Sequence, residues 1–108
     1  MNNINLIGRI CEDITYAQTK SGQTAAYFRI AVKSMTFRGE SRTDHILCRA
    51  WGSMAESMRE RYKKGSKIAV SGCLRTDCWK VKGVKNYVTY VAARRITPTS
   101  ELFGQDDE

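Results

Sequence analysis

Apolar and polar residues alternate along most of this chain, as in strands that bury one of their two faces. Within residues 24–35, for example, Phe28, Ile30 and Val32 fall on one side, and polar or aromatic neighbours fall on the other. Turn residues such as Gly83 separate the alternating segments, and glycine is common in hairpin turns. The pattern predicts strands over residues 4–10, 14–18, 24–35, 43–52, 67–74, 78–82 and 86–96.

One segment has the period of a helix instead. Between residues 53 and 64, two methionines and a tyrosine recur every four residues and form an apolar stripe. Ser53 is expected to cap the helix, with Glu56 three residues later as its capping-box partner. Gly65 follows two lysines and is expected to end the helix.

Glycines inside strand patterns indicate how the strands are coiled. Gly8 and Gly72 lie where bulges or sharp coiling are expected. Together with the element order, they predict an all-β fold, a five-stranded Greek-key barrel with one helix between the third and fourth strands. This is the order of the OB-fold, which binds oligonucleotides. Periodicity alone does not separate it from other small barrels.

The chain is strongly basic. Eighteen Lys and Arg face eleven Asp and Glu over 108 residues, a formal net charge of +7. Residues 99–108 hold four of the acids and no base, so residues 1–98 carry eighteen cations against seven acids. Such a domain indicates a polyanionic partner, most often nucleic acid, although a basic surface can also serve solubility alone. We expect residues 1–98 to form the binding domain and residues 99–108 a short, acidic, disordered tail.

Other classes of protein are disfavoured by what the sequence lacks. No apolar run approaches the roughly 20 residues of a membrane-spanning helix, and the first residues do not resemble a secretory signal. Cys11, Cys48, Cys73 and Cys78 are therefore expected to be free thiols in the reducing cytoplasm. The four-residue gap between Cys73 and Cys78 is not the usual zinc spacing, so no metal or cofactor is expected. His45 is the only histidine and has no identifiable catalytic partner, so no enzymatic activity is expected.

Residues 44–52 carry the clearest functional pattern. The alternation places small apolar residues on one face, and His45, Leu47, Arg49 and Trp51 on the other. An outward-facing tryptophan beside an arginine suits a surface on which bases stack while the cation meets phosphate or stacks too. The alternative is that Trp51 packs under a loop or at a subunit interface.

A second aromatic residue, Trp79, lies among cations on a predicted hairpin arm. These cations are Arg75, Lys80, Lys82 and Lys85. Aromatic residues interleaved with cations suit a binder of single strands that tolerates any sequence, because every base has a π-face and every nucleotide a phosphate. Phe37, in the polar loop before residue 43, can act in the same way or serve as a hydrophobic cap. The strand tyrosines are interpreted as packing residues.

Several motifs in a fixed order resemble the bacterial single-stranded-DNA-binding protein (SSB) family over nearly all of residues 1–98. The resemblance implies an OB-fold that binds and protects single-stranded DNA in replication, recombination and repair, without enzymatic activity. It also implies a homotetramer, with a dimer as the alternative. The motifs are Leu6-x-Gly8-Arg9, Phe28-x-Ile30-Ala31-Val32, Trp51-Gly52-x-x-Ala55-Glu56 and Lys64-Gly65-Ser66-x-x-x-Val70-x-Gly72-x-Leu74-x-Thr76-x-x-Trp79.

The resemblance also assigns roles to single residues. Trp51 and Trp79 match stacking aromatics of the family, His45 stands where the family usually has Trp or Phe, and Phe37 matches loosely. Asp77 departs from the pattern, because the segment before Trp79 is commonly basic in the family. The expected phosphate contacts are Arg9, Arg29, Lys33, Arg49, Arg75, Lys80, Lys82 and Lys85.

The end of the chain departs most from the family. The resemblance implies an acidic tip that ends in a hydrophobic pair and recruits replication and repair proteins. Here residues 105–108 supply the acids, but the apolar pair Leu102-Phe103 lies five residues in, which leaves that recruitment in doubt. Two other functions stay open: a primosomal replication-restart accessory OB-fold protein that binds single strands and a helicase, and a protein-interaction module with a basic face. The resemblance implies the bacterial cytosol or nucleoid as the location, and a plasmid or phage origin also stays open.

Overall fold

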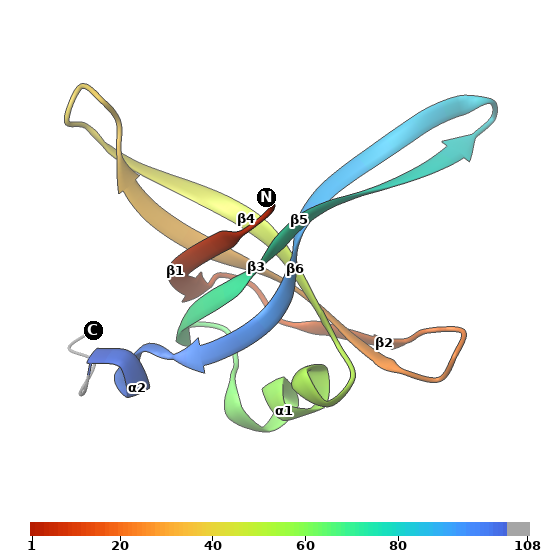
Figure 1. Ribbon diagram of the computed structural model, residues 1–108, viewed down its shortest axis with the longest axis horizontal. Coiled ribbons are helices and arrows are strands. Elements are labelled where there is room, and N and C mark those ends of the chain that lie inside the picture. Colours follow the sequence, from red (N-terminus) through yellow and green to blue (C-terminus); the bar gives the residue numbers. More distant parts are fainter. Residues whose placement is uncertain (104–108) are drawn as a thin grey trace.

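Six strands form a single sheet that coils until its first strand meets its third (Figure 1). The computed structural model describes residues 1–103 and, at position 103, the backbone alone. The sheet order is β1-β5-β6-β4-β3-β2, and β1 also pairs with β3. The elements are β1 (Ile4–Ile10), β2 (Thr15–Gln18), β3 (Thr24–Met35), β4 (Ser41–Trp51), α1 (Ser53–Arg61), β5 (Lys67–Val81), β6 (Val84–Pro98) and α2 (Thr99–Phe103).

The closed barrel confirms the OB-fold predicted from the sequence. Five strands, β1, β3, β4, β5 and β6, close the barrel, and short β2 extends β3 outside the closed ring. The helix α1 therefore follows the fourth strand of the chain but the third strand of the closed barrel. The ring is completed by a short parallel contact between β4 and β6, at Cys48↔Val91 and Arg49↔Ala92.

The core lies inside the barrel and confirms the predicted strand faces. Phe28 and Ile30 of β3 are fully buried, as are Cys48 and Ala50 of β4. Their neighbours along each strand point outward and are partly or fully exposed. Met58 of α1 is also fully buried, so the helix packs against the barrel core with its apolar stripe.

The helix begins and ends differently from the sequence-based expectation. Gly52, not Ser53, is the N-cap, and no side chain caps the helix. The predicted capping box is wrong because the carboxylate of Glu56 accepts a hydrogen bond from the hydroxyl of Thr24 in β3 instead. The helix stops at Arg61, since Tyr62 is already extended, with φ −130° and ψ 153°.

Strands β5 and β6 form one continuous hairpin of 15 residues on each side, although the sequence predicted a break after residue 74. The arm leaves the barrel in its outer half (Figure 1), and every residue of β5 from 74 to 81 is exposed, so buried and exposed positions no longer alternate along that strand. The two residues of the turn, Lys82 and Gly83, both have positive φ, 51° and 81°. This is the conformation of a type I′ turn, whose twist matches that of the strands it joins.

Two glycines allow strands to approach closely, as their positions in the sequence suggested. A Cβ atom at Gly72 would lie 2.1 Å from the carbonyl oxygen of Ala92, and one at Gly8 would lie 2.5 Å from that of Ala31. Gly72 also stands at a register shift between β5 and β6, which confirms the predicted bulge there. At Gly8 no register shift is present, and the close approach of β1 to β3 alone explains why a glycine is needed.

The chain continues beyond β6 as the short helix α2, which covers the first five residues of the expected tail. An ion pair of 3.0 Å between Arg61 and Glu101 connects α2 to the end of α1. The acidic tip, residues 105–108, lies outside the described residues. Neither α1 nor α2 has the length and apolar character that a membrane-spanning helix needs.

Candidate nucleic-acid interface

The strands β3, β4, β6 and β5 are neighbours in the sheet, and their outward side chains form one surface. Paired residues of neighbouring antiparallel strands point to the same side of a sheet. The pairs Tyr27↔Arg49 and Arg75↔Tyr90 therefore extend the outer face of β4 in both directions. We call this surface the outer platform; it comprises Tyr27, Arg29, Lys33, His45, Leu47, Arg49, Trp51, Arg75, Asp77, Trp79, Val88 and Tyr90.

Trp51 lies at the end of β4, where the platform borders α1, and is partly buried. Its ring meets the ring of Tyr90 edge to face, with centroids 6.2 Å apart and planes at 61°. With Arg75 and Gln23, these two rings line a hollow of about 400 Å³. Trp51 thus packs against its neighbours on the outside of the barrel, and it still borders a space beside a cation.

Arg49 is held in place by the protein itself. Its Nη1 donates to Oδ2 of Asp77 at 2.7 Å, and the side chain is only 18% exposed. The guanidinium carbon lies 4.0 Å from the ring centroid of Tyr90 and 5.2 Å from that of Tyr27. The phenol of Tyr90 also donates to Asp77, over 3.3 Å. The carboxylate of Asp77 therefore takes the place beside the Arg49 guanidinium that the sequence analysis assigned to a DNA phosphate.

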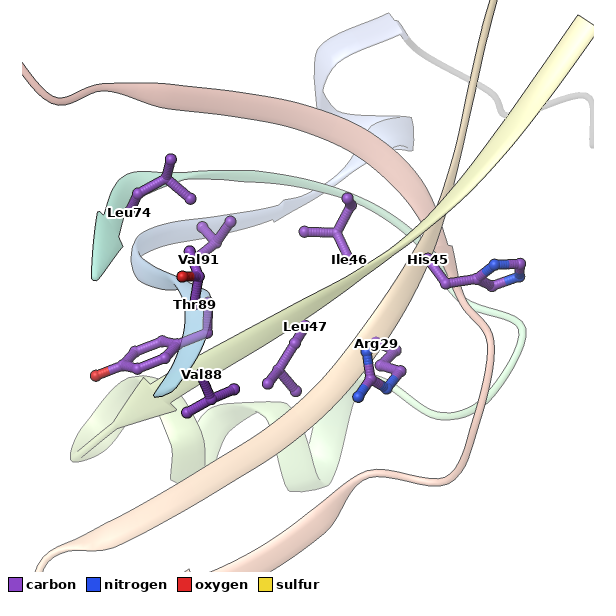
Figure 2. A pocket seen from close by; sticks show the side chains of 9 residues that line it. Arg29, His45, Ile46, Leu47, Leu74, Val88, Thr89 and Val91 are labelled. Carbon is purple, nitrogen blue, oxygen red and sulfur yellow. The ribbon is translucent and has the colours of Figure 1, made fainter. Parts of the chain in front are cut away.

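A groove of about 270 Å³ opens where β4 and β6 diverge beyond their short parallel contact. Figure 2 shows its walls, which are mainly the aliphatic side chains of Leu47, Leu74 and Val88. Arg29 and His45 stand at its rim, and the His45 ring points away from the aliphatic residues. The groove brings both predicted site residues beside an apolar surface of the platform.

Trp79 shares a side of the hairpin arm with Arg75 and Asp77, because the three alternate along β5. Its side chain is 47% exposed. Lys80 and Lys85 stand opposite each other in the register of β5 and β6, and their side chains lie on the other side of the arm from Trp79. The sequence grouped these lysines around Trp79, but the structure places them behind it, and Lys82 lies in the turn.

Phe37 and Arg9 lie at the margins of the platform. Phe37 is 97% exposed in the loop between β3 and β4, which extends in a different direction from the β5–β6 arm (Figure 1). It is therefore not brought together with Trp79. Arg9 of β1 pairs with Ala31, which in turn pairs with His45, so Arg9 continues that row of the outer face. Its Nη1 donates to the carbonyl of Gly65 at 3.0 Å.

Sequence reasoning did not place Tyr27 and Tyr90 on the platform. Tyr90 is only 4% exposed and belongs to a buried cluster with Cys73 and Ala92, in agreement with its interpretation as a packing residue, whereas Tyr27 is partly exposed. Both stand directly opposite an arginine on a paired strand, Arg49 and Arg75 respectively. Only strand pairing brings these residues together, since Arg75 and Tyr90 are distant in sequence. The one signal available in the sequence was parity, because Tyr27 falls on the same side of its strand as Arg29.

All four cysteines are free, and no group of three or more metal-ligating side chains occurs within residues 1–103.

Cys48 is fully buried, and this burial raises the pKa of its thiol to about 12. Only the thiolate reacts with thiol reagents. At about pH 8 we therefore expect a thiol reagent to modify the exposed Cys78 well before Cys48, as located by mass spectrometry of digested protein. Modification of Cys48 at the rate of Cys78 in folded protein would contradict the described burial.

The barrel and its outer platform define the class of this protein. A closed five-stranded barrel with its helix between β4 and β5 is an OB-fold, and many OB-folds bind oligonucleotides. The chain belongs to the single-strand binding protein family, whose sequence model matches residues 1–99.

Named relatives agree with this membership. The chain is 35% identical over 97 residues to "Single-stranded DNA-binding protein 3" of Streptococcus agalactiae serotype V, an alignment that covers 86% of this chain and 70% of the relative. It is equally similar to "Single-stranded DNA-binding protein 1" of Streptococcus pyogenes serotype M18, with 86% and 74% covered. Identity to "Single-stranded DNA-binding protein 1" of Lactococcus lactis is 33%, with 86% and 64% covered.

Proposed function

We propose that this chain binds single-stranded DNA without sequence preference through the outer platform. The observation that carries the proposal is the hollow in which Trp51, Tyr90 and Arg75 converge, on the same face as Trp79. Bases can stack on exposed aromatic faces while a neighbouring cation meets the backbone. Membership of the single-strand binding protein family and the names of the relatives support the same function.

The predicted site residues take different roles in this proposal. Trp51 and Trp79 stack bases, and His45 and Phe37 extend stacking toward the margins. Arg75 is the central phosphate contact, because it borders the hollow beside Trp51. Arg49 contacts phosphate only if Asp77 releases it. The remaining phosphate contacts are Arg9, Arg29 and Lys33 on the barrel, and Lys80, Lys82 and Lys85 on the arm.

The wider role follows from the family. We propose that the protein acts by binding alone, without catalysis, and that it protects single strands in DNA replication, recombination and repair in the cytoplasm. A homotetramer is the proposed assembly and a dimer the alternative, which native mass spectrometry would distinguish. The rival function, a replication-restart accessory protein, is not favoured by the names of the relatives.

A fluorescence titration tests the binding proposal. The emission of Trp51 and Trp79 would be followed while oligo-dT is added at low and at moderate salt, with a duplex of equal phosphate count as the control. Strong quenching by the single strand, with an affinity that falls as salt rises, is expected of stacking on a cationic surface. Equal, weak binding of both forms without quenching would contradict the proposal.

The Asp77→Asn substitution is expected to tighten binding of oligo-dT roughly 3- to 10-fold, or about 0.7–1.4 kcal/mol. The substitution removes one negative charge from the path of the DNA strand and frees Arg49 to contact phosphate. One charge a few ångströms away changes the binding free energy by about this much in a partly solvated site. The matched control is Asp44→Asn, which breaks the Arg42–Asp44 ion pair of 2.9 Å on the loop side of β4. An Asp77→Asn variant that binds no tighter than the control would show that Asp77 does not compete with phosphate.

A further inference from the structure

A second hollow lies on the side of the barrel that α1 covers. It measures about 190 Å³, and its polar lining comes from the end of α1, from β2 and from the loops beside them. Tyr16 of β2 pairs with Ala26, whose side chain is buried in the core, so it points away from the outer platform. The polar residues of the lining are Asp13, Tyr16, Arg59, Tyr62, Lys63 and Lys64.

Two hydroxyl groups in this lining lack hydrogen-bond partners. The phenol oxygens of Tyr16 and Tyr62 are buried, and neither is bonded to any described residue. Burial raises the pKa of both phenols, so each keeps its proton at neutral pH and remains a donor. A buried donor without an acceptor destabilises the fold. Both tyrosines would therefore gain from an acceptor brought in from outside.

The charged groups of the lining are mostly cations. Arg59, Lys63 and Lys64 form no ion pair with any residue in the part of the chain that the structure describes. The guanidinium of Arg59 lies over the ring of Tyr16, 4.3 Å from its centroid. Asp13 is the one acid among them. The lining thus offers many donors and positive charge, and little to satisfy either.

We propose that this hollow binds a phosphate group, and we name it the helix-side site. An anion with several acceptor oxygens matches unpaired cations and free hydroxyl donors together. Arg59 can turn from the ring of Tyr16 toward the anion, and the unpaired hydroxyls of Tyr16 and Tyr62 supply further donors. The phosphate can be a phosphodiester of a strand that continues around the barrel, or a free phosphate ion. The site does not depend on the outer platform, because the two share no residue.

Thermal unfolding in inorganic phosphate tests the site directly. At constant ionic strength, phosphate in place of chloride is expected to raise the Tm of the wild type by about 2–5 °C. Tyr16→Phe should raise the Tm in phosphate-free buffer, because it removes an unpaired hydroxyl, and should reduce the gain from phosphate. Arg59→Gln should abolish that gain. The controls are Tyr87→Phe, an exposed tyrosine on the arm, and Lys20→Gln, an exposed lysine at the β2–β3 turn; both should respond to phosphate as the wild type does.

Oligonucleotides of two lengths identify the source of the phosphate. If a strand reaches the site, Arg59→Gln weakens binding of a long oligo-dT and lowers the slope of log affinity against log salt by about one, while a short oligo-dT binds normally. If free phosphate is the ligand, both oligonucleotides bind the variant normally and only the Tm response is lost. The proposal is overturned if Arg59→Gln keeps the full phosphate shift, as general stabilisation by phosphate would give, and leaves both oligonucleotides unaffected. Failure of the outer platform would appear separately, as absence of binding by the wild type.

Discussion

The Trp79→Ala variant is expected to bind oligo-dT about 5- to 150-fold more weakly than the wild type, a loss of about 1–3 kcal/mol. Trp79 stands on the platform side of the arm and is 47% exposed. It belongs to neither buried hydrophobic cluster, so its removal should leave the Tm nearly unchanged. Trp51 is a less selective target, because it packs against the cluster around Tyr90 and its loss would also affect stability.

Binding would be measured by fluorescence anisotropy of labelled oligo-dT, with unfolding followed in parallel. The matched control is Tyr87→Ala, which removes another exposed aromatic residue from the opposite side of the same arm. The account expects this control to lose far less affinity than Trp79→Ala. Equal losses in the two variants, or none in either, would mean that the arm does not present Trp79 to the strand.

The Gly72→Ala substitution is expected to cause the largest loss of stability, about 3 kcal/mol or more. Its Cβ would lie 2.1 Å from a backbone oxygen of β6, and overpacking against a backbone that cannot move aside exceeds the usual penalty for an added methyl group. Because Gly72 stands at the register shift between β5 and β6, the strain would also disturb the register that directs Arg75, Asp77 and Trp79 outward.

Urea unfolding of the wild type and of the Gly72→Ala variant measures this loss of unfolding free energy. The control is Gly39→Ala, in a loop where φ is +82° and nothing lies within 4 Å of the added Cβ. There the penalty is only that of a left-handed backbone, about 1–2 kcal/mol. If Gly72→Ala were no more destabilising than Gly39→Ala, that result would contradict the close approach of β5 and β6 at Gly72.

The sequence predicted the barrel and the faces of its strands, because burial of one face leaves a period of two wherever a strand crosses the core. Phe28 and Cys48 are in the core and Arg49 and Trp51 are outside, as the alternation indicated. The signal disappears on the outer half of the β5–β6 arm, which has no core to face. This is why the continuous strand β5 was predicted as two pieces.

Contacts between distant residues could not be predicted. Glu56 has the spacing of a capping-box residue, but Thr24 on another strand takes its carboxylate. Arg49 has the character of a phosphate contact, but Asp77, 28 residues away, forms an ion pair with it. Both outcomes depend on which strands meet in the fold. The resemblance to the family indicated only that Asp77 was unusual at its position, and the structure shows its partner.

Photo-crosslinking tests the central claim, that the outer platform carries the single strand, most directly. Oligo-dT containing bromodeoxyuridine would be irradiated in complex with the protein, and the crosslinked peptides identified by mass spectrometry. The account predicts crosslinks to peptides that contain Trp51, Trp79 or Tyr90, which are lost in excess unlabelled oligo-dT. Crosslinks confined to peptides of α1 and β2, with none on β4, β5 or β6, would contradict it.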